Sequence, residues 1–316
     1  MRIVLLLLLT LVSACATRAP VGEQKRIALT FDDVPRVRGA FMTPDERTAR
    51  LIAALKQAGV RQAAFFVTPG NLDTPDGAGG EKRISAYAAA GHVLANHSFG
   101  HRALSAIPAA DYLADIDRAE AWLKGRKARR PWFRHPYLNE GRADKAKRDA
   151  IRVGLKARGL RNGYVTVDGS DWNMDALTTK AVQAGKTIDM AALRDLYVET
   201  HVEAAEFNDA LARRTIDRSP AHVMLLHETD IAALFIPDLV KGLRAKGWTI
   251  VTADEAFGDL LRDAMPDVPS AQGTLTEAMA WQKGLPAPRW YDRASPRIAD
   301  PLFATRVLKE APAKPE

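Results

Sequence analysis

The 316-residue chain is poor in cysteine and in aromatic residues. Its single cysteine, at position 15, cannot form an intramolecular disulfide, which excludes the class of small disulfide-stapled domains. Aromatic residues make up only 7% of the chain, and the densest basic stretch, residues 124–130, contains none. Nucleic-acid grooves combine basic stripes with stacking aromatics. The excess of 45 Lys and Arg over 38 Asp and Glu therefore does not predict a nucleic-acid partner.

Long apolar runs are also scarce. The run over residues 3–12, interrupted only by Thr10, is about half of the roughly 20 residues that span a bilayer. A basic start at Arg2 and small residues after the run are typical of a secretory signal. The segment Val12-Ser13-Ala14-Cys15 resembles a bacterial lipobox and predicts a signal peptide over residues 1–14 and a lipid on Cys15. A plain signal peptide with an incidental cysteine is the alternative.

The lipobox interpretation predicts an exported protein. We expect it to be lipid-anchored in the cell envelope through Cys15, on the periplasmic face, with residues 15–24 as a short linker. Ala16, standing where an aspartate would follow the cysteine, favours the outer membrane in a Gram-negative host. The sequence indicates no protein partner.

From residue 25 onward, short apolar runs alternate with longer segments of helical periodicity. The first predicted helix opens with the capping box Thr43-Pro44-Asp45-Glu46 and stops at Gly59. Seven consecutive strand–helix units predict a parallel sheet with crossover helices, closed or nearly closed into a barrel, with an open doubly wound sheet as the alternative. Strands are expected over residues 26–31, 62–67, 92–96, 132–135, 164–167, 221–226 and 248–251. The later helices are expected over residues 81–90, 109–124, 143–158, 189–213, 231–246 and 254–261.

The regular pattern stops near residue 266, after which prolines become frequent. We therefore expect one domain over residues 25–265 and an irregular, Pro-rich tail over residues 266–316. The tryptophans and tyrosine of this tail are expected to dock it onto the barrel.

Polar residues gather where the predicted strands end. In parallel α/β barrels the carboxyl ends of the strands form the active-site face, so these side chains are expected to converge. They are Asp32 and Asp33 after the first strand, His97 and His101 after the third, Arg134 at the fourth, Asp171 after the fifth and His227 at the sixth.

Three of these residues suggest a metal site. Two adjacent aspartates alone are typical of a turn or cap, but His97 and His101 would lie one turn apart if helical, a common geometry for one transition metal. With Asp33 they supply two nitrogens and one oxygen and leave coordination positions open. Open sites of this kind are more often catalytic than structural.

Five ordered motifs stand at the ends of the predicted strands. They are Thr30-Phe31-Asp32-Asp33, His97-Ser98-Phe99-Gly100-His101, Arg134-His135-Pro136-Tyr137, Asp168-Gly169-Ser170-Asp171-Trp172 and Leu225-Leu226-His227. Together they resemble the motifs of the polysaccharide deacetylase family, the NodB homology domain or carbohydrate esterase family 4. The similarity covers about residues 25–263 and implies the family's fold, a distorted, incomplete (β/α)7 barrel of parallel strands with surrounding helices.

The resemblance also implies roles for these residues. Asp33, His97 and His101 resemble the ligands of a divalent metal, usually Zn²⁺, with Co²⁺ or Ni²⁺ as alternatives. Asp32 resembles the general base, and Arg134 would position it.

The remaining motif residues resemble the family's other catalytic and binding groups. The backbone N–H of Tyr137 would stabilise the oxyanion. His227 resembles the general acid, held by Asp171. Trp172, Leu225 and Pro136 are the expected substrate-binding residues, at the walls around the acetyl group.

The implied activity is metal-dependent removal of N-acetyl groups from an envelope or extracellular polysaccharide, such as peptidoglycan or another GlcNAc-containing glycan, with release of acetate. A catalytically inactive carbohydrate-binding lipoprotein, or a hydrolase of the same fold acting on O-acetyl esters or non-sugar amides, are the alternatives.

Three departures from the family pattern bear on the choice of substrate. They are Val34 in place of glycine, His135 beside Pro136, and the long segment 173–219, which is expected to form an extra wall. His92, His201 and His222 have no spacing partner and are expected to be ordinary packed or surface histidines.

Overall fold

The computed structural model describes residues 24–311, and strand β1 (Arg26–Val34) lies at the centre of its sheet. Strand β1 pairs in parallel with β2 on one side and with β8 on the other. The strand order is β6-β4-β3-β2-β1-β8-β7, and β9 adds to the start of β1. The other strands of this sheet are β2 (Ala64–Val67), β3 (Val93–Asn96), β4 (Arg129–Phe133), β6 (Arg161–Asn162), β7 (Val167–Asp168), β8 (Ala221–His227) and β9 (Thr249–Ile250).

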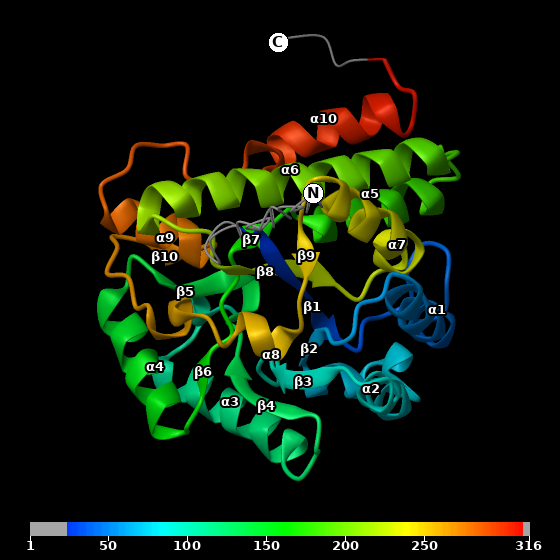
Figure 1. Ribbon diagram of the computed structural model, residues 1–316. Helices are drawn as coiled ribbons and strands as arrows, with labels where there is room; N and C mark the ends of the chain where they lie inside the picture. Colours follow the sequence, from blue (N-terminus) through cyan, green and yellow to red (C-terminus); the bar gives the residue numbers. More distant parts are fainter. Residues whose placement is uncertain (1–23, 312–316) are drawn as a thin grey trace, which may run out of the picture.

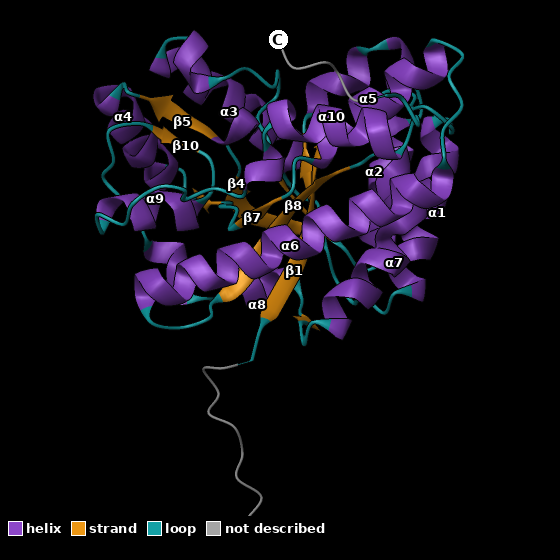
Figure 2. Ribbon diagram, turned by 90° about the horizontal axis from the view of Figure 1, so that it is seen from above, coloured by secondary structure: helices purple, strands orange, loops and turns teal. Residues whose placement is uncertain are grey.

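Helices surround the strands, which lie in the middle of the molecule (Figures 1 and 2). The helices are α1 (Pro44–Gln57), α2 (Gly80–Ala89), α3 (Ala109–Leu123), α4 (Lys145–Ala157), α5 (Asp171–Gln183), α6 (Met190–Ile216), α7 (Asp230–Ala245), α8 (Ala253–Ala256), α9 (Leu275–Gln282) and α10 (Pro296–Arg306). The first helix begins as its sequence predicts, because Thr43 and Glu46 form both hydrogen bonds of the capping box.

The sheet curves into a barrel that does not close. Strands β6 and β7 follow each other in the chain but end opposite sides of the strand order, and no pairing joins them within residues 24–311. Other groups bridge the intervening segment: Arg134 Nε donates to the Gly163 carbonyl (2.7 Å), and Leu275 N donates to the Val165 carbonyl (2.7 Å). The predicted distorted, incomplete (β/α)7 barrel is thereby confirmed.

The side chains of β1 point alternately to two faces of the sheet and so belong to two different parts of the core. Ile27, Leu29 and Phe31 belong to the large cluster that the sheet forms with α1, α6 and α7. Ala28 belongs to a second cluster inside the barrel, with Ala64 and other small or aromatic side chains. Since side chains alternate along a strand, Thr30 and Asp32 follow Ala28 on the interior side and lead to the carboxyl end of the barrel.

The predicted elements around the fifth strand need correction. Instead of one strand over residues 164–167, there are two short strands: β6 ends before this segment, and β7 begins at its last residue, Val167. Helix α5 was not predicted within the 173–219 segment. It buries polar residues, including Asn173, Asp175 and Thr178, so it lacks the apolar periodicity that reveals an amphipathic helix.

The predicted irregular tail is also more ordered than its proline content suggests. Residues 266–311 contain β10 (Ala271–Gln272), which pairs with β5 (Asn139–Arg142), and helices α9 and α10. Pro296 occupies the start of α10, where its fixed φ suits a helix and its missing N–H costs nothing. Helix α10 lies along α6 (Figure 1), and its Arg306 forms an ion pair with Glu199 of α6 (2.9 Å).

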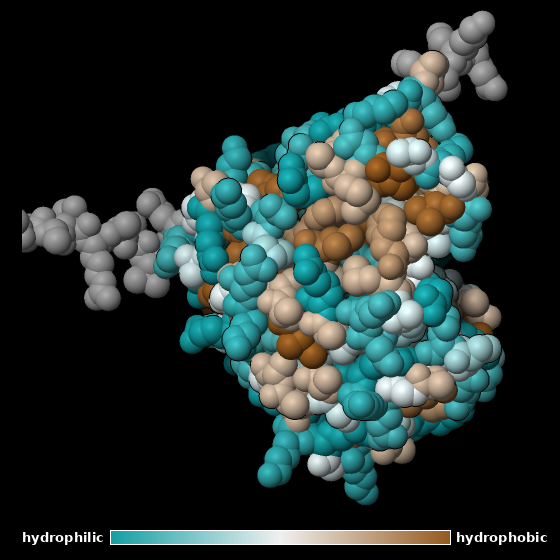
Figure 3. All heavy atoms as spheres, turned by 90° about the vertical axis from the view of Figure 1, so that its right-hand side faces the viewer, coloured by the Kyte–Doolittle hydropathy of each residue, from teal (hydrophilic) through white to brown (hydrophobic). Residues whose placement is uncertain are grey.

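The surface that carries α1, α2 and α7 is largely hydrophilic, with hydrophobic side chains gathered in patches that are largest in its upper half (Figure 3). Among residues 24–311, no helix combines the length and the apolar character needed to cross a membrane. The predicted signal peptide, Cys15 and nearly all of the predicted linker lie outside the described residues.

Candidate active site

Strand register brings the predicted residues to one end of the barrel. Asp32 lies directly opposite His227 in the β1–β8 pairing. Asn96, at the end of β3, is aligned with Phe133 of β4. His97 and Arg134 therefore leave their strands at the same level. This register brings the side chains together at the carboxyl ends of the strands, as the sequence predicts.

Asp32 and Asp33 both face the cleft although neighbouring strand residues normally point in opposite directions. Asp33 has a φ of 65°, which breaks the alternation at the end of β1. Left-handed backbone at a residue other than glycine is costly and recurs at functional sites, where the surroundings hold it. The turn thus delivers two carboxylates to one place.

His97 and His101 lie on a loop and not on a helix, so the helical geometry considered from their spacing is wrong. Ser98 (φ 64°) and His101 (φ 50°) turn the chain, and Ser98 Oγ accepts a hydrogen bond from His101 N (3.0 Å). The Asp115 carboxylate accepts two further hydrogen bonds from backbone N–H groups of the loop, those of Phe99 and Gly100. The imidazole centroids end 4.9 Å apart.

Asp33, His97 and His101 form a candidate metal site, since one ligand atom from each lies within 4.8 Å of the others. Asp33 Oδ1 is 2.8 Å from His101 Nε2 and 3.4 Å from His97 Nε2. His97 Nδ1 donates to the Arg134 carbonyl (2.9 Å), which leaves its Nε2 lone pair for a ligand. Asp33 Oδ1 is buried and has no hydrogen-bond donor, so the donor set fits a divalent cation.

The Asp33 carboxylate is strongly biased to its charged form. Burial alone would raise its pKa, but the adjacent imidazoles of His101 and His97 and the charges of His227 and Arg36 hold that pKa well below the ordinary value. A metal ligand must be deprotonated, so this bias suits the site.

Arg134 holds Asp32 from inside the barrel. Its Nη1 donates to Asp32 Oδ1 (2.6 Å) and to Thr30 Oγ1 (2.7 Å), and its Nε donates to the Gly163 carbonyl. Arg134 and Asp32 are 1% and 2% exposed. A buried ion pair with these additional hydrogen bonds fixes the Asp32 carboxylate in one orientation.

His227 and Asp171 form the second predicted pair. His227 Nδ1 donates to Asp171 Oδ1 and His227 N donates to Asp171 Oδ2, both at 2.7 Å. Burial lowers the pKa of His227, but the charge and hydrogen bond of Asp171 outweigh it and raise that pKa to about 9. His227 is therefore protonated at neutral pH, as a general acid requires.

These groups share one cleft of about 660 Å³. Tyr137 and Trp172 line it and are 59% and 43% exposed, and the less accessible Leu225 lines it as well. Pro136 is buried and is not among the lining residues, so the structure does not bring it to the expected position.

The structure also adds residues that the sequence did not single out as site residues. Arg36 and Asp168 line the cleft, and so do Gln272 and Gly273 from the tail. Burial raises the pKa of Asp168. Its position at the end of β7 is a strand-end signal of the kind that identified the other residues, whereas Arg36, Gln272 and Gly273 stand in loops or a short edge strand without such a signal.

The other histidines are packed in the interior. His92, His201 and His222 are at most 4% exposed, in keeping with the packed-histidine expectation. His135 is buried against Tyr112, whose Oη lies 3.2 Å from its Nδ1. His135 is not among the residues that line the cleft, so its expected influence on the choice of substrate is not exerted by direct contact there.

A barrel end that carries the Asp32–Arg134 and His227–Asp171 pairs beside three side chains that could hold a metal is typical of a hydrolase. A family model described as polysaccharide deacetylase matches residues 20–157. A chitin deacetylase of Colletotrichum lindemuthianum is 26% identical over 237 residues, covering 74% of this chain and 79% of the relative.

Over residues 20–157 the chain is thus similar to the polysaccharide deacetylase family. The solved structure of the Colletotrichum lindemuthianum chitin deacetylase shares its fold, with 23% identity, a TM-score of 0.51 and coverage of 75% of this chain and 89% of that one. A family 4 carbohydrate esterase from Streptomyces lividans is 22% identical, with a TM-score of 0.48 and coverage of 77% and 98%.

Proposed function

We propose that the protein is a metal-dependent deacetylase that removes N-acetyl groups from an envelope or extracellular polysaccharide and releases acetate. The observation that carries the proposal is the cleft in which the Asp33–His97–His101 cluster lies beside both the Asp32–Arg134 and the His227–Asp171 pairs. Amide hydrolysis needs an activated water, a stabilised oxyanion and a protonated leaving amine, and these groups can supply all three.

Asp33, His97 and His101 would hold the metal. A divalent cation bound there would polarise the acetyl carbonyl and lower the pKa of the attacking water. Zn²⁺ fits two imidazoles and one carboxylate, and Co²⁺ or Ni²⁺ fits the same ligands.

Asp32 would take the proton of the attacking water. Its Oδ1 is held by Arg134, which leaves Oδ2, 3.6 Å from His97 Nε2, on the side of the metal-ligating cluster. Tyr137 would place its backbone N–H against the oxygen of the scissile carbonyl, in a turn where it has a φ of 59°. Arg134 would thus orient the Asp32 carboxylate and would not itself accept the proton of the water.

His227 would deliver a proton to the departing amine. Because Asp171 accepts from Nδ1, the transferable proton lies on Nε2. Trp172 and Leu225 supply apolar surface beside this group for the acetyl methyl and the sugar.

The substrate is proposed from chemistry and from the relatives together. The Colletotrichum lindemuthianum relative is a chitin deacetylase, so an N-acetylglucosamine polymer, chitin-like or peptidoglycan, is the proposed class of substrate. Export and anchoring through Cys15 remain a proposal that rests on the lipobox-like segment alone.

Acetate release from N-acetylated glycans tests the activity. We expect release by the wild-type protein, loss on chelation, and recovery on adding Zn²⁺. Asp32→Asn should remove turnover while zinc still binds. Turnover of acetyl esters alone would favour the esterase alternative, and glycan binding without acetate release would favour an inactive binding protein.

The ligand assignment has its own test. His101→Ala should lose both zinc and activity, because it removes one of three ligands. Zinc content per chain is measured after dialysis. A content equal to that of the wild-type protein would show that His101 is not a ligand.

A further inference from the structure

Arg36 lines the cleft, and its guanidinium lies between Asp33 at the end of β1 and Asp175 on helix α5. It follows β1 by two residues, its side chain is 23% exposed, and its Nη1 donates to Asp33 Oδ2 (2.7 Å). On its other side, Nη2 lies 3.8 Å from Asp175 Oδ2 on helix α5. Asp175 stands one helical turn after Asp171, so the same guanidinium faces both the metal-ligating strand end and the helix that orients His227.

The two oxygens of Asp33 are divided between different partners. Oδ1 faces the two imidazoles and accepts no hydrogen bond, whereas Oδ2 accepts from Arg36. A carboxylate with both oxygens free can rotate or bind a cation through both. With Oδ2 held by a guanidinium, Asp33 offers one oxygen in one direction.

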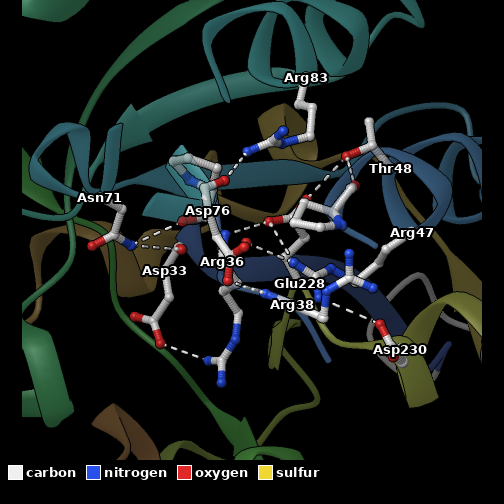
Figure 4. A network of polar contacts seen from close by, with 12 residues as sticks. Asp33, Arg36, Arg38, Arg47, Thr48, Asn71, Asp76, Arg83, Glu228 and Asp230 are labelled. Atoms are coloured by element: carbon white, nitrogen blue, oxygen red, sulfur yellow. Dashed lines mark hydrogen bonds and ion pairs between the residues drawn. The ribbon is translucent and has the colours of Figure 1, made fainter. Parts of the chain in front are cut away.

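The backbone that carries Arg36 is itself held firmly (Figure 4). Asn71 Nδ2 donates to the carbonyls of Asp33 (3.2 Å) and Pro35 (3.0 Å). Arg36 N donates to Glu228 Oε2 (2.8 Å), and the Arg36 carbonyl accepts from Arg47 Nη2 (2.8 Å). Because these hydrogen bonds fix the backbone of this segment, the Arg36 guanidinium can hold the Asp33 carboxylate in one position.

The network continues into the helices behind the loop. Glu228, which is fully buried, accepts at Oε1 from Tyr87 Oη (2.6 Å). Arg47 forms an ion pair with Asp230 (3.3 Å). These contacts connect the Arg36 segment to α1, α2 and α7, so the position of the guanidinium is determined by the frame of the barrel.

We propose that Arg36 is a positioning residue that holds Asp33 as a single-oxygen metal ligand and connects it, through Asp175, to the helix that carries Asp171. The inference rests on the proposed metal site. A guanidinium near a cation also repels it. Asp175 lies against the other side of Arg36 and offsets part of that charge, so the gain in ligand orientation is expected to dominate.

The test measures zinc affinity directly, by competition with a chromophoric chelator and with zinc as the only added ligand. Arg36→Gln should weaken zinc binding by about 10- to 100-fold, the usual cost of losing a group that orients a ligand. Arg36→Lys keeps the positive charge but replaces the planar guanidinium with a single ammonium group. An intermediate loss of zinc affinity is therefore expected. Arg38→Gln is the matched control, since Arg38 lies in the same loop with an exposed side chain and should leave affinity unchanged.

A kinetic measurement separates positioning from a general loss of structure. The activity of Arg36→Gln should be low at limiting zinc and should recover at saturating zinc, whereas a damaged fold would not recover. Thermal unfolding of the metal-free proteins checks the fold, and Arg36→Lys carries the test if Arg36→Gln does not fold.

Equal or tighter zinc binding by Arg36→Gln, or by Arg36→Lys in its place, would overturn this inference while leaving the proposed function intact. Wild-type protein that binds no zinc would remove the proposed metal site and this inference with it.

Discussion

The proposed role of His227 depends chiefly on one neighbour, Asp171. Asp171 accepts hydrogen bonds from both the ring Nδ1 and the backbone N of His227, at 2.7 Å each. Burial alone would lower the pKa of the imidazole, and the Asp171 carboxylate reverses that effect. A residue 56 positions away in the chain therefore decides whether this histidine carries a proton at neutral pH.

Replacing Asp171 by Asn should lower the alkaline limit of activity. With Asp171 present, the pKa of His227 is raised to about 9, so this proposed general acid loses its proton only above that pH. Asp171→Asn removes the stabilising charge, so the alkaline limb of the kcat/KM profile should move down toward pH 6.5, the usual pKa of histidine. Turnover should fall by roughly 100-fold, within the range of general acid–base contributions.

Zinc content is the control for this variant, and it should not change. An alkaline limb that stays in place in both Asp171→Asn and His227→Ala, with activity retained, would contradict the assignment of His227 as the acid.

A second prediction at the scale of the residue concerns stability. Burial lowers the pKa of His92 to about 4, and its Nδ1 accepts a hydrogen bond from Ala63 N (3.2 Å). Because the folded-state pKa lies below the unfolded value near 6.5, the unfolded chain binds this proton first as the pH falls. The stabilisation that depends on a neutral His92 is therefore complete above about pH 6.5 and is lost by about pH 4. Its loss lowers the free energy of unfolding by roughly 3 kcal/mol.

The variant His92→Gln should therefore reduce the dependence of stability on pH in this range, since its amide oxygen can still accept from Ala63 N. Urea unfolding at pH 7, 5.5 and 4 measures the effect. Parallel pH dependences for the two proteins would contradict it.

At the scale of the element, the turn between β7 and α5 is set by close packing. A Cβ on Gly169 would lie 2.7 Å from Cδ2 and 2.9 Å from Nε2 of His201, so only glycine lets α6 approach this turn. His201 is fully buried and is held by the Tyr197 carbonyl (2.7 Å). The long helix α6 thus supports the turn that places Asp171, as well as forming a wall.

Gly169→Ala should push this turn away from α6. Overpacking of this kind costs about 1–3 kcal/mol, and the shift of Asp171 should reduce kcat as well. The double variant Gly169→Ala, His201→Ala should regain part of the activity, because it removes the ring that clashes. Unfolding free energies and kcat of both variants test the argument, and an absence of any recovery would show that the clash is not with His201.

At the scale of the whole molecule, the cleft draws on distant parts of the chain. Asp32 and Asp33 come from the first strand, whereas Gln272 and Gly273 come from the tail. The tail reaches the cleft because β10 pairs with β5, and α10 then packs against α5 and α6. The segment after residue 265 is therefore part of the barrel's structure and of its cleft.

Anchoring is the prediction that concerns the molecule in its cell. The lipobox-like segment predicts that the full chain is found in the membrane fraction and that Cys15→Ser releases it or leaves its signal uncleaved. Fractionation and immunoblotting of both proteins measure this. Identical fractionation would contradict the lipid anchor.

Much of the fold and the site could be predicted from the sequence because the signals are local. The strand–helix alternation, the capping box before α1 and the polar residues at strand ends are all read over a few residues. Parallel strands place their carboxyl ends together, so Asp33, His97 and His101 could be expected to meet.

Other features were decided by tertiary structure, because they depend on contacts between residues far apart in sequence. Helix α5 buries polar groups, and α10 is stabilised by pairing with α6, so neither shows in a local pattern. Pro136 is buried by the packing around it, and the partner that holds Asp33, Arg36, is identified only when the loop is folded. The sequence by itself determined that the active site lies at the carboxyl ends of the strands, through local periodicity and the polar residues at strand ends. Only the tertiary structure decided which side chains line the cleft, because that depends on packing between distant segments.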